Sequence, residues 1–496
     1  MLMHSITPFV YAAAIVFQQA TAPKPFHIRE SIHEIRIELT KAQWDAMQPQ
    51  RSGGMDSEYP EERAKVTING RELDVAIRFK GNASYRSSQG SLKRPFKIDV
   101  NKFIKTQSVN GETTINLSNN AMDPSGIREA IAYTVFRKLG VVCSRTAFAK
   151  VTLNIPGSYE NKVLGLYTSS EQLDTDFLKS AYGTAPSLVL KPEGAHTLPY
   201  GDDWAPYEKT YDPKGKPSDA DKQHFMAFTK FVHEASDDEF AAKLGTYLDI
   251  PQFAKFLAGT VVTGSLDTIL MMGHNFYIVR NPKSGKYEFL PWDLDLAFGG
   301  FPMAGIDATQ LSIYQPVGDR EILVKRFLSV PAAQTSYLAA CKATVTILEG
   351  MAPEIDQLSK VVAPVKLLDD RTQVAGGQGG PGGPGGFFEP TSVSASKDAI
   401  FVVSGNRILK FSANGLSLES TAQLPATEGD GFPRGPGGPF GGPGGPGGPG
   451  GPGGFGRNVN LNDFIKQRIE QVKLQLNGKS AGVTPRSMGP GGPGRP

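Results

Sequence analysis

Cysteine and histidine are scarce in this chain of 496 residues, which contains two cysteines and seven histidines. So few cysteines exclude a fold that depends on a disulfide framework. Cys143 and Cys341 also lie too far apart in the sequence for a zinc site built from closely spaced Cys and His ligands. Two alternatives stay open for this pair: one long-range disulfide, or two buried thiols.

The chain also lacks a large excess of positive or of negative charge. Lys and Arg number 52, Asp and Glu number 49, and the formal net charge is +3. Proteins dedicated to nucleic acids usually carry a strong excess of basic residues on one face or stripe. We therefore expect no nucleic-acid partner.

No apolar run reaches the roughly 20 residues that a membrane-spanning helix requires. The run over residues 6–17 is too short, and Ala20-Thr21-Ala22 follows it with the small-x-small pattern of a signal-peptidase site. We expect residues 1–22 to be a cleaved signal peptide. The mature chain would then have no membrane span and be exported to the cell envelope, the cell surface or the extracellular space.

Glycine is concentrated in residues 376–386, 429–456 and 489–496, which hold 28 of the 56 glycines. These segments are rich in Gly-Gly-Pro, a composition typical of flexible spacers. The pattern predicts four regions after the signal peptide: a main domain over 27–373, an insert over 374–456, a closing segment over 457–478 and a disordered tail over 479–496.

Two of the smaller regions have patterns of their own. Inside the insert, residues 391–425 alternate between apolar and polar residues and contain turn signals, which predicts a small β-meander. Residues 460–477 are amphipathic with a helical period. We expect this helix to complete the main domain, so that the insert is a loop pushed out of the domain's surface.

Strand patterns dominate the first part of the main domain. The most specific is 66–80, where Asn69-Gly70 marks the turn of a hairpin. Arg78, Lys80 and Lys97 are predicted to face away from the apolar side of this antiparallel sheet. Further strands are predicted over 32–39, 94–100, 148–155 and 162–170. One helix, over about 124–139, is predicted to begin at Asp123-Pro124 with its apolar residues on one face.

From residue 220 the apolar period becomes helical, with one hairpin over 275–293. Helices are predicted over 221–234, 237–246, 250–259, 321–329 and 333–349. The chain is therefore predicted to be α+β, with an antiparallel sheet and one helix in its first part and mainly helices in its second.

A loop of small residues joins two basic strands. Lys80 ends the first strand, the loop contains Gly81, Asn82 and Ser84, and Lys97 lies in the second strand. Small residues let backbone N–H groups approach phosphates, and a lysine on a neighbouring strand adds fixed positive charge. The alternative is an ordinary hairpin with a solvated basic face.

The strongest signal is acidic. Asp293 and Asp295 lie two residues apart at the predicted end of a strand, and Asp267 lies eight residues before Asn275. Carboxylates are costly to bury without a partner, and oxygen ligands suit Mg²⁺ or Mn²⁺. Asp267 then remains as a base that orients an acceptor hydroxyl. The alternative is a calcium site or a purely structural carboxylate pair.

The order of these segments resembles the CotH family, spore-coat-type proteins with an atypical, secretory-pathway-like protein kinase fold. The similarity lies in RFKGNASYR with KRPFKIDV, in SGIREAIAYTVFRKLGV, in GLYTSSEQLDTDFL and in the hairpin from HNFYIV to KYEFLPWDLDLAFGG. It covers roughly residues 30–373 and resumes at 458–478. The resemblance implies a two-lobed fold, with an antiparallel-sheet N-lobe and a mainly helical C-lobe.

The resemblance also implies roles for single residues. Lys97 resembles the nucleotide-binding lysine, with Lys80 or Lys93 as alternatives, and Glu129 resembles its partner on the helix. For Glu129 the alternative is one exposed charge among many. Asp267 resembles the catalytic aspartate, Asn275 the metal-side asparagine and Asp293 the metal-binding aspartate, a role that Asp295 fits nearly as well.

The pattern departs from ordinary protein kinases in two ways. Asp267 and Asn275 are eight residues apart, whereas the catalytic Asp and Asn of those kinases are about five apart. The chain also has no GxGxxG loop and no HRD triplet, so the loop from Gly81 to Ser84 would have to take the place of the glycine-rich loop.

The function implied by the resemblance is an exported protein kinase that uses ATP with Mg²⁺ or Mn²⁺. It would transfer the γ-phosphate to Ser or Thr hydroxyls of a protein substrate. The alternative is a non-catalytic surface or coat assembly protein that uses the kinase-like fold as a binding scaffold for a coat partner.

Deletion of residues 374–456, with a short linker in their place, is expected to leave the main domain folded. Gly/Pro tracts bury little surface, and each doubling of loop length costs only about 0.6 kcal/mol. Thermal unfolding of the full chain and of the deletion variant checks this. A large fall in melting temperature would show instead that the meander packs into the core.

Overall fold

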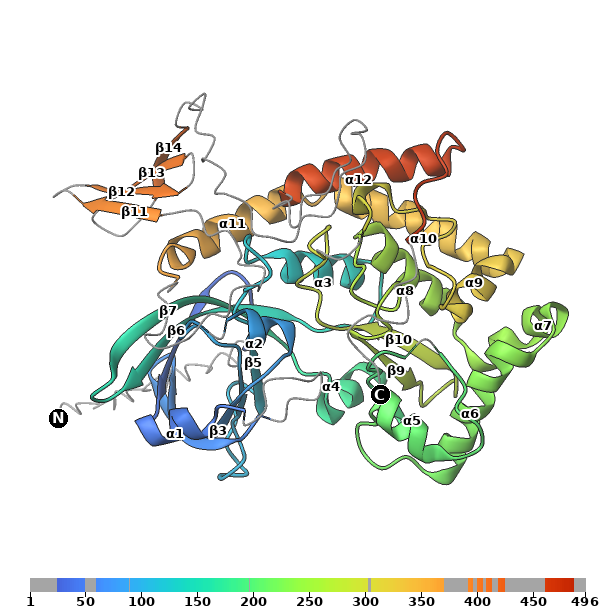
Figure 1. Ribbon diagram of the computed structural model, residues 1–496, viewed down its shortest axis with the longest axis horizontal. Helices are drawn as coiled ribbons and strands as arrows, with labels where there is room; N and C mark the ends of the chain where they lie inside the picture. Colours follow the sequence, from blue (N-terminus) through green and yellow to red (C-terminus); the bar gives the residue numbers. More distant parts are fainter. Residues whose placement is uncertain are drawn as a thin grey trace, which may run out of the picture.

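The computed structural model describes residues 25–49, 59–88, 90–195, 197–301, 305–369, 391–395, 399–404, 407–412, 418–423 and 460–485. These residues form a β-rich N-lobe and a mainly helical C-lobe, which lie side by side in Figure 1. The predicted two-lobed α+β fold is therefore confirmed. The predicted signal peptide and the Gly-Gly-Pro tracts lie outside the described residues.

One seven-stranded sheet forms the N-lobe, in the order β5-β4-β3-β2-β1-β6-β7. Only β1 and β6 pair in parallel. The sheet curls so that its two edge strands, β5 and β7, meet. At this contact the backbone N–H of Ser118 donates to Thr168 O at 2.8 Å, and the N–H of Thr168 donates to Ser118 O at 3.0 Å. The strands are β1 (Ile32–Glu38), β2 (Glu62–Ile68), β3 (Arg71–Phe79), β4 (Phe96–Asp99), β5 (Thr114–Leu117), β6 (Thr146–Ile155) and β7 (Tyr159–Ser170).

The predicted Asn-Gly hairpin is confirmed as the β2–β3 pair. Asn69 and Gly70 both have positive φ angles, 49° and 84°, which the turn of a two-residue hairpin requires. The apolar side chains of these strands point into the curled sheet and form a core of their own, with Val66, Val75 and Ile77 fully buried. Two short helices, α1 (Lys41–Ala46) and α2 (Ala83–Ser87), complete this lobe.

Helix α3 (Arg128–Lys138) lies between the two lobes and packs against β6, α8 and α10. It begins later than predicted, because the Asp123 carboxylate accepts hydrogen bonds from the backbone N–H of Ser125 and of Arg128 and holds the intervening segment in a turn. It is also not apolar on one face only. Every residue from Arg128 to Phe136 is buried, since both lobes cover the helix.

The C-lobe is mainly helical around a small sheet in the order β10-β9-β8, and its core includes α3. The predicted hairpin over 275–293 is confirmed as β9 and β10. Helices α4, α5 and α11 were not predicted from the sequence. The elements are α4 (Thr175–Tyr182), β8 (Val189–Leu190), α5 (Trp204–Tyr211), α6 (Asp219–Glu234), α7 (Asp237–Tyr247), α8 (Ile250–Val262), β9 (Phe276–Arg280), β10 (Tyr287–Pro291), a 3₁₀ turn (Ala308–Gln310), α9 (Ile322–Ser329), α10 (Pro331–Glu349) and α11 (Ala352–Lys366).

Within the insert, the described residues form the predicted meander. Its strands pair antiparallel in chain order: β11 (Thr391–Ala395), β12 (Ala399–Ser404), β13 (Arg407–Ser412) and β14 (Leu418–Gln423). The prediction of a disordered tail from residue 479 is wrong for 479–485. There the backbone N–H of Val483 donates to Gln310 O at 2.7 Å, and its carbonyl accepts from Ser312 N–H at 2.9 Å.

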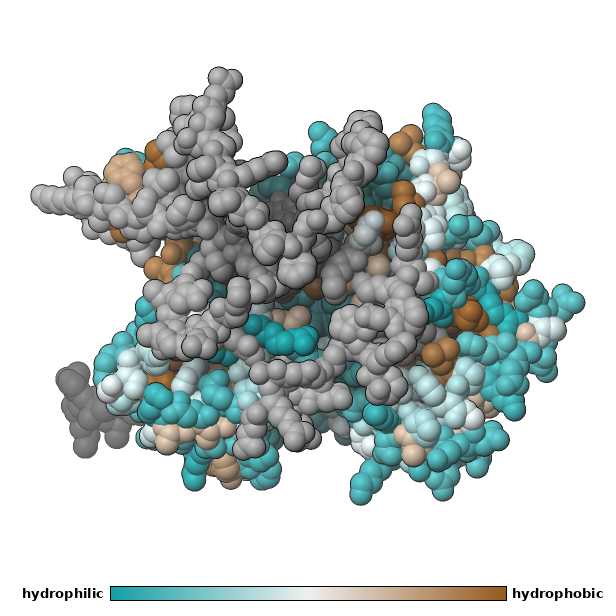
Figure 2. Space-filling view, in the orientation of Figure 1, coloured by the Kyte–Doolittle hydropathy of each residue, from teal (hydrophilic) through white to brown (hydrophobic). Residues whose placement is uncertain are grey.

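Three further features bear on the sequence predictions. Cys143 and Cys341 are both buried and unpaired, so the alternative of two thiols holds. Within the described ranges, none of the helices combines the length and the apolar character needed to cross a bilayer. On the face shown in Figure 2, hydrophilic residues cover most of the visible C-lobe, and apolar residues appear in small groups.

Helix α12 (Leu461–Leu476) follows the insert in sequence and packs along α10 in the C-lobe. Its Arg468 is fully buried and donates hydrogen bonds to four backbone carbonyls. Two of these, Val261 O at 3.1 Å and Val262 O at 3.4 Å, are at the C-terminal end of α8, and the others are Thr309 O and Leu311 O. Arg468 therefore adds hydrogen bonds to the last carbonyls of α8, of which Val261 O also accepts from the backbone N–H of Gly264 at 3.1 Å.

Phe464, one turn earlier on α12, lies against the two loops that leave α8 and β10. A methyl group placed on Gly264 or on Gly299 would lie 2.8 Å from its ring. Both glycines have positive φ, 63° and 75°. The backbone N–H of Phe298 also donates to Thr263 O at 2.7 Å and ties the two loops together. The Phe464 ring thus packs against both loops, and a larger residue at Gly264 or Gly299 would displace the ring.

Replacing Phe464 with alanine is expected to lower the free energy of unfolding by about 3–5 kcal/mol, because it removes a buried ring and leaves a cavity. Denaturant unfolding measures the change. Leu474→Ala is the matched control, since Leu474 lies on the same helix but is 38% exposed and its loss should cost little. Equal stability of the two variants would contradict the packing role of Phe464.

Candidate functional site

The loop after α8 folds back on itself and brings Asp267 beside Asn275. The Asn275 Nδ2 donates to the backbone oxygen of Asp267 at 2.9 Å and to its Oδ2 at 3.3 Å. Asn275 has a positive φ of 59° and immediately precedes β9. The eight-residue separation of Asp267 and Asn275 is therefore closed by a loop, and the two side chains lie in contact.

His274 holds the other oxygen of the same carboxylate, with its Nε2 2.8 Å from Asp267 Oδ1. Burial alone would lower the pKa of His274. The hydrogen bond and the charge of Asp267, with smaller effects from Glu193 and Asp293, outweigh burial and raise the pKa above its ordinary value. The two contacts fix the Asp267 carboxylate in one orientation. The sequence analysis did not select His274, although it directly precedes Asn275.

Asp293 and Asp295 follow β10 at the same end of the hairpin. Pro291 pairs with Phe276, and the backbone N–H of Trp292 donates to Asn275 O at 3.1 Å. The hairpin register therefore places the start of the Asp293–Asp295 segment next to Asn275, as predicted. The backbone N–H of Asp293 donates to the hydroxyl oxygen of Tyr133 on α3 at 3.1 Å, and its φ is positive at 53°.

Asp295 is the centre of a group of carboxylates. Burial raises the pKa of its carboxyl well above the ordinary value. The charges of Asp293, Glu129, Asp267 and Asp123 raise it further, in that order. The group therefore draws acidic residues from the loop before α3, from α3 itself, from the loop after α8 and from the end of β10. A cation placed there would lower this repulsion.

Glu129 links this group to the N-lobe. Its side chain is buried and its Oε2 has no hydrogen-bond partner among the described residues. Burial and the charge of Asp293 raise the pKa of Glu129, whereas the charge of Lys80 lowers it. The alternative of an exposed charge on the helix surface is excluded for Glu129.

The three candidate lysines have different surroundings. Lys93 forms an ion pair with Asp369 at 2.8 Å, beyond the end of α11. The charge of Lys80 lowers the pKa of Glu129, and among the described residues no ion pair joins Glu129 to Lys80 or to Lys97. Of the three lysines, Lys80 is the one whose charge acts on the pKa of the helix glutamate.

Lys97 belongs to a second, positive group. Burial lowers its pKa to about 8, and the charges of Arg78, Lys80 and Lys214 add to this effect. Arg78 is its direct neighbour across the β3–β4 pair, and Lys214 comes from the segment after α5. Cations crowded in this way are stabilised by an anion, and a phosphate is one that such groups bind.

The loop of small residues begins at Gly81, whose φ is 74°, and continues into α2. Tyr59 donates a hydrogen bond from its hydroxyl to Gly81 O. Asn82 occupies the N-cap position of α2 without a side-chain capping bond, and Ser84 lies in its first turn. This loop connects Lys80 with β4, the strand of Lys97. A loop between two lysines is a suitable position for binding phosphate.

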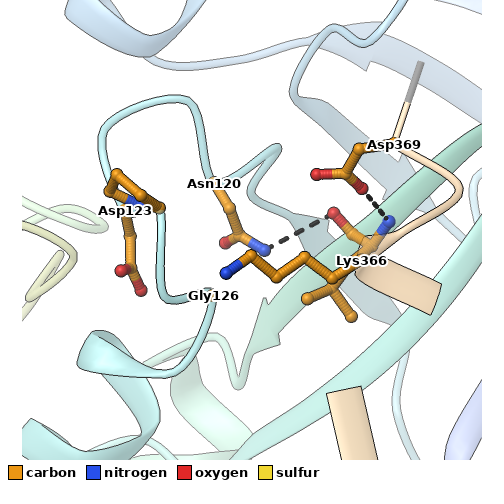
Figure 3. Close-up of a pocket in the computed structure, with 7 residues that line it drawn as sticks. Asn120, Asp123, Gly126, Lys366 and Asp369 are labelled. Carbon is orange, nitrogen blue, oxygen red and sulfur yellow. Dashed lines mark hydrogen bonds between the residues drawn. The ribbon is translucent and has the colours of Figure 1, made fainter. Parts of the chain in front are cut away.

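A small pocket lies next to this site, between the loop before α3 and the end of α11 (Figure 3). Asp123 lines it and also belongs to the acidic group around Asp295. At its other side Asp369 Oδ1 accepts a hydrogen bond from the backbone N–H of Leu166 at 2.7 Å. The residues that the sequence predicts for nucleotide and metal do not line this pocket. Its lining is Asn120, Asp123, Pro124, Gly126, Leu166, Lys366 and Asp369.

Comparisons with known proteins identify the family of the chain. Residues 77–378 match the protein family described as "CotH kinase protein". Inner spore coat protein H of Bacillus subtilis (strain 168) is 24% identical over 324 residues, which are 62% of this chain and 81% of that protein.

Among solved structures, the Helicobacter pylori proinflammatory kinase CtkA matches with 10% identity, covering 68% of this chain and 96% of its own. The TM-score of 0.24 is too low to support an argument about the fold. The fold rests on the two lobes described above and on the family match.

Lys97→Met is expected to stabilise the protein by about 1–3 kcal/mol at pH 7, since one pKa unit corresponds to about 1.4 kcal/mol. The pKa of Lys97 falls from 10.5 to about 8 on folding. Below pH 8 the folded protein therefore bears the full cost of a buried charge. Between about pH 8 and 10.5 the unfolded chain binds more protons, so wild-type stability rises with pH and the advantage of the variant disappears.

Denaturant unfolding of both proteins from pH 7 to pH 10.5 measures this difference. Lys255→Met, at an exposed position of α8, is the matched control and should show no such trend. A constant difference between wild type and Lys97→Met over this range would contradict the interpretation.

Proposed function

The chain belongs to the CotH kinase family and has a two-lobed, kinase-like fold, and on this premise we propose that it transfers the γ-phosphate of ATP to Ser or Thr hydroxyls of a protein. One observation carries the proposal. Like charges are crowded in an acidic group around Asp295 and in a basic group around Lys97, and the charge of Lys80 in the basic group also lowers the pKa of Glu129 in the acidic group. A nucleotide with its metal brings the opposite charge to each group.

The basic residues fit the phosphates of ATP. Lys80 is the proposed nucleotide lysine, because its charge acts on Glu129, as the strand lysine and helix glutamate of protein kinases act on each other. Lys97 supplies a second cation beside it. The loop over Gly81, Asn82 and Ser84, which follows Lys80, is proposed to offer backbone N–H groups to the phosphates in place of the glycine-rich loop of those kinases.

The acidic residues fit Mg²⁺ or Mn²⁺. Asn275, Asp293 and Asp295 offer the oxygen donors that these ions prefer, and the crowding of carboxylates around Asp295 is relieved by a cation. A bound metal ion would neutralise charge on the β- and γ-phosphates. Of the two aspartates, Asp295 is affected by the charges of four other carboxylates, and Asp293 is the more exposed.

Asp267 is the proposed catalytic residue. Its carboxylate is held by His274 and Asn275, so one orientation is fixed before a substrate binds. A carboxylate in that place can accept the proton of a Ser or Thr hydroxyl as the hydroxyl oxygen attacks the γ-phosphate. His274 acts through Asp267, as a positioning residue.

The alternative function is assembly of a surface or coat layer, with the kinase-like fold as a binding scaffold. It is favoured by the relative named inner spore coat protein H and by the Gly/Pro-rich composition of the insert. Under either function we propose that the chain is exported to the cell envelope or coat, with residues 1–22 as its signal peptide.

Two single substitutions test the proposed function. Asp293→Asn should abolish metal-dependent ATP binding, and it should spare or raise thermal stability without metal because it removes a charge that acts on Glu129 and Asp295. Asp267→Asn should leave ATP binding intact and lower phosphate transfer by about 10²- to 10⁴-fold. Calorimetry with Mn²⁺–ATP and transfer of labelled phosphate to a serine-rich protein measure the two effects.

Asp319→Asn is the matched control, since its carboxylate is 97% exposed in the C-lobe and should affect neither measurement. Equal binding of Mn²⁺–ATP by wild type and Asp293→Asn would remove the metal from the proposal. The assembly scaffold would then be the better account.

A further inference from the structure

Three residues from separate segments of the N-lobe converge, and none of them is among the residues proposed to bind nucleotide or metal. His27 precedes β1, Glu112 lies just before β5, and Glu171 directly follows β7, where the chain leaves for the C-lobe. One ligand atom from each of the three lies within 4.8 Å of the others. None of them belongs to the acidic group around Asp295.

The histidine is the unusual member. Its side chain is 0% exposed, and neither ring nitrogen has a hydrogen-bond partner among the described residues. Burial of polar atoms without partners costs free energy, and most buried imidazoles in proteins are hydrogen-bonded. The His27 Nδ1 lies 3.3 Å from Glu112 Oε1, close enough for an ion pair but without hydrogen-bond geometry.

This distance fits two ligands of one metal ion. Two atoms bound to Zn²⁺ at about 2.1 Å with a tetrahedral angle lie about 3.4 Å apart. Imidazole nitrogen and carboxylate oxygen are both common Zn²⁺ ligands. The nitrogen of His27 and an oxygen of Glu112 therefore need almost no movement to share an ion, and Glu171 needs a shift of less than about 1 Å.

Arg145 holds the third residue in place. Its Nε donates to Glu171 Oε2 at 2.8 Å, its Nη2 donates to Oε1, and its backbone N–H donates to Oε2 at 3.1 Å. Carboxylates that bind metals are commonly oriented by such outer hydrogen bonds, and Oε1, which accepts from one of these donors, keeps a second lone pair. The Arg145 side chain is 45% exposed, so solvent screens its charge at the edge of the cluster.

We propose that His27, Glu112 and Glu171 bind a divalent transition-metal ion of the Zn²⁺ class, with Arg145 as the outer partner of Glu171. The ion fastens the segment before β1 to the residue at which β7 ends. It therefore stabilises the N-lobe and the start of the connection to the C-lobe, independently of nucleotide binding. A proton on His27, in an ion pair with Glu112, is the competing occupant.

Titration calorimetry with Zn²⁺ tests the proposal on the full chain without nucleotide. The Asp293→Asn variant serves as the parent, in excess Mg²⁺, so that binding at the proposed nucleotide site does not contribute. We expect one Zn²⁺ per chain and a rise in melting temperature on binding. Adding Glu112→Gln should lower the affinity by at least the roughly 10- to 100-fold that loss of an outer partner costs.

Glu34→Gln is the matched control in the same parent, because Glu34 lies on β1 with its side chain 62% exposed. His27→Asn is the second test of the ligand set. If the His27→Asn variant does not fold, the result for Glu112→Gln decides whether the proposal holds. Absence of Zn²⁺ binding by the parent, or equal binding by the Glu112→Gln and Glu34→Gln variants, would overturn the proposal and leave a protonated His27 as the occupant. Neither result depends on phosphate transfer.

Discussion

Like charge crowded at the junction of the lobes is the constraint on which the site depends. Asp295 has four carboxylates as its electrostatic neighbours, and burial adds to their effect. Only some of these acids are stabilised locally: Asp123 by the backbone before α3, and Asp267 by His274 and Asn275. The folded chain thus holds negative charge that its own described side chains leave partly unbalanced, which is costly for stability and useful for binding a cation.

The elements that bring the charges together are buried helices rather than the loops that carry them. Helix α3 lies between the lobes and supplies both Glu129 and Tyr133, whose hydroxyl accepts the backbone N–H of Asp293. Helix α12 places Phe464 against Gly264 and Gly299, so one ring supports the loops of Asp267 and of Asp293. Because α12 follows the Gly/Pro-rich insert in sequence, the residue that packs beneath both site loops, Phe464, comes from a part of the chain beyond the insert.

The three lysines near the nucleotide loop show how similar residues separate into different tasks. Lys93 is used in a structural ion pair with Asp369 beyond α11, Lys80 acts on the buried Glu129, and Lys97 remains among cations. Arginine and lysine side chains on neighbouring strands repel one another unless an anion lies between them. The N-lobe therefore uses one lysine in an ion pair and leaves Lys80 and Lys97 close enough for their charges to act on each other.

The sequence by itself determined the local features: the Asn69-Gly70 hairpin, the β9–β10 hairpin, most helices of the C-lobe, the meander and the Asp293–Asp295 pair. Periodicity, turn residues and short motifs act over a few neighbouring residues, so they can be read along the chain. Only the tertiary structure decided that Glu129 is buried beside Asp293, that α3 is covered by both lobes, and that His274 holds Asp267. These depend on how the lobes pack and on how a loop closes, and such distances between residues far apart in sequence leave no local pattern.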